Sequence, residues 1–261
     1  MGEPLVLSEF DPSTGIARIV LNRPDVLNAI DIATADAFLQ TVRMTVAKEG
    51  LRCVLLKGAG RSFCTGGDLK TFSDPASAVQ VIDRILKPMH EAVLVLVRCP
   101  APIITAVQGI AAGAGFSLAL CGDLVLAAES AKFAVAYTRL GGVPDCGLTW
   151  SLGRRIGPAK TLEFLLNDTV IDAPAAKTLG IVTEVLPDES FERFVEERVG
   201  RLAGGATRAL AACRMLLGDE HALADQLEKE RAAFLAAAGT RDFAEGVAAF
   251  LARREARFEG H

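Results

Sequence analysis

Two glycine-rich turns carry the residues whose types and spacing could do chemistry. One reads CTGGD at residues 64–68 and the other AGAG at residues 112–115, and each follows an apolar run and precedes a possible helix start. Glycines let a ligand approach the backbone closely, and the first N–H groups of a helix have no partner within it. Two such donors could converge on one carbonyl oxygen and stabilise negative charge there. Alternatively, the glycines only permit tight turns and close packing.

Two other chemistries must be weighed for these turns. Phosphate binding fits poorly, because no Gly-Lys-Ser/Thr follows a four-residue gap and the dinucleotide fingerprint would need a glycine at Leu118. Nucleophilic catalysis by Ser117 is the other, because GFSLA resembles GxSxG, and Asp145 and His221 follow in the order of α/β-hydrolases. Against it, the Ser-to-Asp gap is short and His221 lies in the polar start of a terminal helix.

Composition limits the class of protein. The 261 residues, 51% of them hydrophobic, suffice for one large domain or a domain with a small appendage. The net charge is −4, so the chain lacks the excess of basic residues that is typical of nucleic-acid-binding proteins, and we expect no nucleic-acid partner. Apolar runs end well before about 18 residues and no signal peptide is apparent, which predicts a cytoplasmic protein that does not cross a membrane. Six cysteines without a CxxC pair and three scattered histidines predict reduced thiols and no metal site.

The elements that must position the turns follow a strand, strand, helix order. Alternating runs at 5–10 and 16–22 around DPSTG predict a β-hairpin. Helices are expected at 31–48, with Asp31 as N-cap, at 78–98 and from 114 to 120. Further strands are expected at 52–60, 102–110, 123–129 and 131–136. From about residue 190, Ala, Glu, Arg and Leu dominate, which predicts three or four helices.

Several motifs in order along the chain resemble the crotonase (enoyl-CoA hydratase/isomerase) superfamily. They are LNRP with Asn28 and Ala29, SFCTGGDLK at 62–70, GIAAGAG at 109–115, and the run from AKF at 131–133 to Gly157. The resemblance implies an α/β (α+β) fold, with a spiral of ββα repeats over residues 1–190 that holds an acyl-CoA site. It also implies a helical trimerisation region over residues 191–261, and hence a homotrimer or a dimer of trimers.

The same resemblance implies a ligand and a site. The ligand is an acyl-CoA thioester, and no cofactor is needed because coenzyme A is part of the substrate. Enolate charge formed next to the thioester carbonyl would be held by two fixed N–H donors. The donors correspond to the backbone N–H groups of Gly67 and Ala114. Coenzyme A contacts correspond to Asp25, Val26, Leu27, Thr65 and Lys70.

The chain departs from the hydratases of this superfamily at both catalytic glutamates. Ser117 stands at the first position and Tyr137 at the second, so both side chains are expected to contact the substrate. Neither unperturbed hydroxyl is an efficient acid or base near neutral pH. The substitution disfavours standard hydration, and weak or atypical hydration stays an alternative.

Asp145, in GVPDCG, is the carboxylate that remains in this part of the sequence. Its surroundings resemble phenylacetate-pathway and related enoyl-CoA isomerases, in which this aspartate is the acid/base. One carboxylate suffices to take a proton from one carbon and return it to another, so the sequence favours an isomerase. Alternatively, Asp145 caps the helix that begins near CGLTWSL, where the helix donors would lower its pKa.

Two more functions stay open. In 4-chlorobenzoyl-CoA dehalogenases an aspartate here attacks the aromatic ring, aided by a histidine that His90 matches and a tryptophan that Tyr137 replaces. An acyl-CoA-binding protein without efficient chemistry is the other, because both glutamates are gone. His90 would otherwise face the core or the pocket wall. The acyl chain stays undefined, because the apolar residues between Phe72 and Pro88 lie in a variable region.

Overall fold

Two sheets form the centre of the molecule in the computed structural model, which describes residues 3–261. The larger sheet has six strands, in the spatial order β1 (Val6–Asp11), β2 (Ile16–Leu21), β3 (Cys53–Gly58), β4 (Ile103–Val107), β6 (Leu124–Ala128) and β9 (Glu184–Leu186). The smaller sheet contains β5 (Ile110–Ala112), β7 (Lys132–Ala134) and β8 (Val170–Asp172). From β2 to β9 the larger sheet is parallel, and the predicted β1–β2 hairpin is confirmed as its antiparallel edge.

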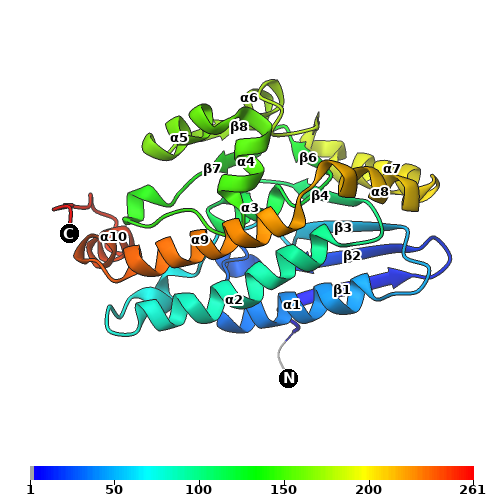
Figure 1. The fold of residues 1–261 in the computed structure, drawn as a ribbon. Helices are drawn as coiled ribbons and strands as arrows, with labels where there is room; N and C mark the ends of the chain where they lie inside the picture. Colours follow the sequence, from blue (N-terminus) through cyan, green and yellow to red (C-terminus); the bar gives the residue numbers. More distant parts are fainter. Residues whose placement is uncertain (1–2) are drawn as a thin grey trace.

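Helices cover the sheets (Figure 1). They are α1 (Ile32–Val46), α2 (Ala78–Val97), α3 (Ala114–Ala119), α4 (Leu148–Ile156), α5 (Pro158–Leu166), α6 (Ala173–Thr178), α7 (Phe191–Ala203), α8 (Thr207–Leu217), α9 (Glu220–Ala238) and α10 (Arg241–Leu251). The carboxylate of Asp31 accepts the N–H of Thr34 and so caps α1 as predicted. No helix within residues 3–261 is long and apolar enough to cross a membrane.

From β4 to β7 successive strands alternate between the two sheets, as the predicted spiral of repeats requires. β4 and β6 belong to the large sheet, whereas β5 and β7, which follow them along the chain, pair in the small one. Cys64, after β3, bridges to Ala111 of β5, and Gly67 bridges to Ile30 after β2. The small sheet is thereby continued by single bridges, so equivalent turns of successive repeats lie side by side.

The single strand predicted at 102–110 is wrong, because the chain breaks between β4 and β5. Gln108 leaves the sheet and its side-chain amide donates to the carbonyl oxygens of Gly58 and Gly60. Gly109 follows with φ +61°, and a Cβ there would lie 2.0 Å from the carbonyl oxygen of Arg61. The break moves the chain from the large sheet to the small one.

Central strands are buried on both faces, as their continuous apolar sequences require. β4 is buried at every residue and β3 at all but Lys57. In parallel sheets both faces are covered, so such strands lack the alternation of a half-exposed strand. Here α1 and α2 pack together, α7 packs against β2 and β3, and α9 runs beside α2 (Figure 1).

The C-terminal part is helical, as expected: α7, α8, α9 and α10 follow one another from residue 191 to residue 251. The division of the chain at residue 190 and the trimerisation role of these helices stay predictions.

Candidate active site

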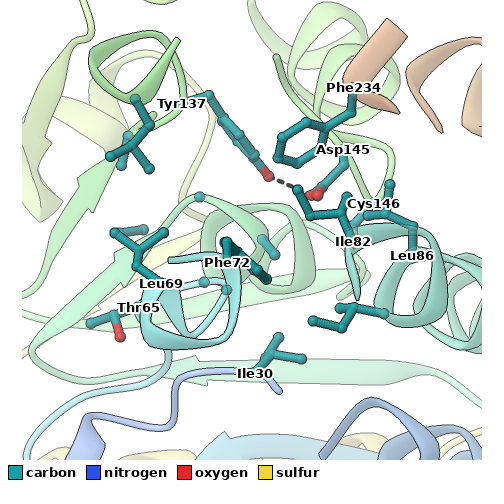
Figure 2. Close-up of a pocket in the computed structure, with 18 of the residues that line it drawn as sticks. Ile30, Thr65, Leu69, Phe72, Ile82, Leu86, Tyr137, Asp145, Cys146 and Phe234 are labelled. Atoms are coloured by element: carbon teal, nitrogen blue, oxygen red, sulfur yellow. Dashed lines mark hydrogen bonds between the residues drawn. The ribbon is translucent and has the colours of Figure 1, made fainter. Parts of the chain in front are cut away.

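A cavity of about 290 Å³ lies where the two glycine-rich turns meet α2 and the C-terminal helices. Its wall is largely apolar, and Asp145 is the one carboxylate among the described residues that line it. Figure 2 shows Tyr137 and Asp145 pointing toward each other in this cavity. The apolar wall includes Ile30, Leu69, Phe72, Ile82, Ile85, Leu86, Met89, Phe234, Phe243 and Phe250.

The two turns are held together by backbone hydrogen bonds between successive repeats. The N–H of Cys64 donates to Ile110 (3.1 Å), and the N–H of Ala112 donates to Cys64 (2.9 Å). Gly67 and Ala114 follow these residues and both line the cavity. Neither of their N–H groups donates to another group within residues 3–261. Two free backbone donors therefore lie at one wall, and their use as an oxyanion hole stays a prediction.

Glycine is required in both turns for steric reasons as well. Gly66 has φ +85°, and a Cβ there would lie 2.9 Å from the carbonyl oxygen of Ala112. Gly113 precedes the first helical residue of α3 with φ +54° and ψ −127°, a backbone conformation that is essentially restricted to glycine. The structural explanation of these glycines therefore holds, and their chemical role stays a prediction.

Asp145 is deeply buried and is paired with Tyr137. Its residue surface is 4% exposed, and the Tyr137 hydroxyl donates to Oδ1 at 2.6 Å. Burial raises the pKa of Asp145 to about 6, and the hydrogen bond from Tyr137 opposes that rise. Burial also raises the pKa of Tyr137 well above its usual value, so the phenol stays a proton donor to Asp145. Asp145 thus combines a cavity position with a pKa close to neutral, as a general base requires.

Ser117 is not among the described residues that line the cavity, and its contact with the substrate stays a prediction. It is fully buried, its hydroxyl donates to the carbonyl oxygen of Asp145 (2.8 Å), and it lies 3.2 Å from the Tyr137 hydroxyl. The hydrolase interpretation fails, because His221 is exposed at the start of α9 and does not bond to Ser117. A small residue here leaves room for Tyr137 and fixes the backbone of Asp145.

Asp145 does not cap α4, contrary to the alternative weighed for it. The N-cap is Gly147, and the carboxylate that serves the helix start is Glu230 of α9. Gly147 N–H donates to Oε2 (2.7 Å) and Thr149 N–H to Oε1 (3.0 Å). Sequence reasoning missed Glu230, although a signal existed: it occupies a buried position in register with Leu223, Leu227 and Phe234.

His90 is a supporting residue and does not line the cavity. Its Nε2 accepts the N–H of Cys146 at 3.2 Å, and its residue surface is 7% exposed. Burial lowers its pKa to about 4, so the ring is neutral at neutral pH and can act as this acceptor. The ring therefore positions the backbone next to Asp145.

The predicted coenzyme A contacts lie beside the first turn. Thr65 lines the cavity, and its N–H donates to the carbonyl oxygen of Leu27 at 3.2 Å. Asp25 and Val26 are exposed in the short 3₁₀ helix just before Leu27. Lys70 is exposed in the 3₁₀ helix Leu69–Phe72, next to the cavity residue Leu69. Their contact with coenzyme A stays a prediction.

Comparison with known proteins decides the family. The sequence profile of the enoyl-CoA hydratase/isomerase family matches residues 11–261. The chain belongs to this family. Within the enoyl-CoA hydratase/isomerase family, the 1,2-epoxyphenylacetyl-CoA isomerase of Escherichia coli is 36% identical, with 94% of this chain and 95% of the relative covered. A probable enoyl-CoA hydratase of Rhodobacter capsulatus is 37% identical, with coverage of 96% and 97%.

Solved structures of the family confirm the crotonase fold. The crystal structure of an enoyl-CoA hydratase from Mycobacterium avium subsp. paratuberculosis superposes with a TM-score of 0.86 at 27% identity, with 98% of each chain covered. The enoyl-CoA hydratase of Bacillus halodurans gives the same TM-score at 24% identity. Relatives named hydratase and relatives named isomerase both occur, so family membership leaves the reaction to be inferred from the site.

Burial of Asp145 predicts a stability cost that a neutral side chain removes. Because its folded pKa of about 6 exceeds the ordinary 3.8, the cost is absent below about pH 4, grows toward pH 6 and is complete above it. At about 1.4 kcal/mol per pKa unit, we expect Asp145→Asn to stabilise the fold by roughly 2–3 kcal/mol at pH 8 and not at pH 4. Denaturant unfolding of the wild type and of Asp145→Asn at both pH values measures this difference in stability. Equal free energies of unfolding for the two proteins at pH 8 would contradict the prediction.

Proposed function

We propose that this protein is an enoyl-CoA isomerase that converts a 3-enoyl-CoA into the 2-enoyl-CoA. Asp145 is the proposed proton shuttle, and the N–H groups of Gly67 and Ala114 form the proposed oxyanion hole. The observation that carries the proposal is a buried carboxylate, the single one among the described residues that line the cavity, together with two free N–H donors at the same wall. The relative named 1,2-epoxyphenylacetyl-CoA isomerase supports isomerisation as the class of reaction.

Each proposed step uses a group that this chain supplies. Ionised Asp145 takes a proton from C2, and the electron pair of the broken C–H bond delocalises over the thioester carbonyl and the C3–C4 double bond. The two N–H donors hold the resulting charge on the carbonyl oxygen. Asp145 then returns the proton to C4, which leaves the double bond between C2 and C3. No water is consumed, which fits the absence of a second cavity carboxylate among the described residues.

Substrate binding in this proposal uses both the apolar wall and the first turn. The acyl chain lies against the apolar residues contributed by α2, α9 and α10. Coenzyme A follows Leu27 and Thr65 outward to Asp25, Val26 and Lys70. We also propose the homotrimer, or a dimer of trimers, as the assembly, with no cofactor apart from the coenzyme A of the substrate.

Proton exchange in deuterated buffer tests the proposal. We expect the protein to convert a 3-enoyl-CoA to the 2-enoyl-CoA and to exchange deuterium at C2 and C4 far faster than buffer alone. Formation of a 3-hydroxyacyl-CoA at a higher rate would identify a hydratase instead. Neither exchange nor hydration, despite binding of the thioester, would identify a binding protein and refute the isomerase.

The Tyr137–Asp145 bond predicts a specific pH dependence. Because the base must be ionised, kcat/KM should fall as pH drops below about 6. Tyr137→Phe removes a donor that stabilises the anion, so the acid limb should move to higher pH, by about one unit. Phe234→Leu changes the ring that meets Tyr137 edge-on (6.2 Å) and should change KM without moving the limb. An unmoved limb in Tyr137→Phe would show that this bond does not tune the base.

A further inference from the structure

Side chains from three separate elements hold the segment from Asp145 to Thr149. Ser117 of α3 binds the Asp145 carbonyl oxygen, His90 of α2 binds the Cys146 N–H, and Glu230 of α9 binds Gly147 and Thr149. Cys146 has φ +53°, an uncommon conformation for a residue with a side chain. These hydrogen bonds from three elements indicate that the backbone of residues 145–149 is held in one conformation.

Glu230 is the acidic member of this group; it is 4% exposed, and burial raises the pKa of its carboxyl to about 7. Its Oε1 accepts both the N–H and the hydroxyl of Thr149, and its Oε2 accepts the N–H of Gly147. Gln226, one turn earlier on α9, donates to the same Thr149 hydroxyl at 3.0 Å. With a donor on each oxygen, the carboxylate is matched to the start of α4.

Glu230 accepts backbone N–H groups at the start of α4 that the Asp145 carboxylate could otherwise accept. Gly147 lies two residues after Asp145, the spacing at which an aspartate side chain accepts a backbone N–H in a turn or cap. No backbone N–H within residues 3–261 donates to the Asp145 carboxylate. Backbone donors would stabilise the anion and make a weaker base.

We propose that Glu230 is a positioning residue for Asp145: it occupies the first donors of α4, so the Asp145 carboxylate stays uncapped and directed into the cavity. The groups that face Asp145 are then the Tyr137 hydroxyl, the Cys146 thiol and, beyond the segment, Glu230 and His90. This role rests on the proposed function, in which Asp145 is the base. The distribution of donors is nonetheless measurable without any turnover.

Titration of Asp145 tests the proposal directly. Aspartate-selective ¹³C labelling reports carboxyl groups by NMR, and the spectrum of Asp145→Asn assigns the Asp145 signal. Glu230→Gln keeps the side-chain size but offers one acceptor oxygen in place of two, so one of the helix donors becomes free. When the Asp145 carboxylate accepts the freed backbone donor, its pKa falls, and we expect a fall of about one unit.

Catalysis supplies the second readout. In Glu230→Gln the acid limb of kcat/KM should move to lower pH and kcat above pH 7 should fall several-fold, with KM unchanged. Glu228→Gln is the matched control, because Glu228 lies on the same helix but is exposed and pairs with Arg231. It should leave the limb and the Asp145 titration unmoved.

An unchanged Asp145 titration in folded Glu230→Gln, or an equal fall in the control, would overturn the proposal. If Glu230→Gln does not fold, Thr149→Val removes the hydroxyl that donates to Oε1 and accepts from Gln226. The substitution loosens the hold of Glu230 on the start of α4 and should lower the pKa of Asp145 by a smaller amount. No change there would overturn the proposal as well. Failure of the proposed isomerase function would give a different result: in the wild-type protein Asp145 would titrate as expected, but no protons of the 3-enoyl-CoA would exchange.

Discussion

Asp145→Asn should lower the rate of proton exchange into a 3-enoyl-CoA by about 10²–10⁴-fold, the usual contribution of a general base. The side-chain oxygen of asparagine can still accept the Tyr137 hydroxyl, so the cavity should keep its shape and KM should change little. The measurement is deuterium incorporation at C2 and C4 under single-turnover conditions, with thioester binding measured separately.

Asp36→Asn is a control for the chemical change itself, because Asp36 is exposed on α1 and remote from the cavity wall. It should exchange at the wild-type rate. If Asp145→Asn exchanged as fast as Asp36→Asn, another group would have to be the base. If it exchanged slowly but no longer bound the thioester, the loss would reflect binding and not chemistry.

Ala114→Pro should lower kcat by about 10²–10³-fold, the cost of removing one preorganised oxyanion donor. Ala114 is the first residue of α3, where proline is tolerated because its fixed φ suits the helix and no intrahelical N–H is lost. The substitution therefore deletes the N–H that faces the cavity with little effect on the helix. Steady-state kinetics and a thermal melt, measured together, separate the two effects.

Arg241→Pro is the matched control, because Arg241 is the exposed first residue of α10, whose N-cap is Thr240. It makes the same change at another helix start and should leave kcat unchanged. Loss of activity in Ala114→Pro without a change in its melting temperature would support the donor role. Wild-type activity in Ala114→Pro would exclude the Ala114 N–H from the oxyanion hole.

Local patterns were enough to predict most of the fold. The Asp31 cap, the β1–β2 hairpin and the buried parallel strands all follow from short-range sequence signals. The motif resemblance supplied the spiral order, which the solved structures of the family confirm. The break at Gln108 and Gly109 was missed because PIITAVQGI is apolar on both sides of it, and only the sheet pairing separates the two strands.

The candidate site was predictable only where one stretch of chain decides the geometry. Both turns, Asp145 and Tyr137 could be named in advance, and the structure brings them to one cavity. The contacts of Ser117, His90 and Glu230 could not, because each depends on elements far apart in sequence meeting at residues 145–149. A helix start was visible after Asp145, but the residue that caps it lies 83 positions away from Gly147.

That separation has a consequence for how the protein is made. The turns with Gly67 and Ala114 are fixed by contacts among residues that leave the ribosome early, such as Cys64, Ile110 and Ala112. The segment at Asp145 gains its last support only when α9 docks, and contacts that close such long loops form late because of their entropic cost. We therefore expect the two turns that carry the Gly67 and Ala114 N–H groups to fold before translation ends. The segment that carries Asp145 should take its final shape only after the C-terminal helices have been synthesised.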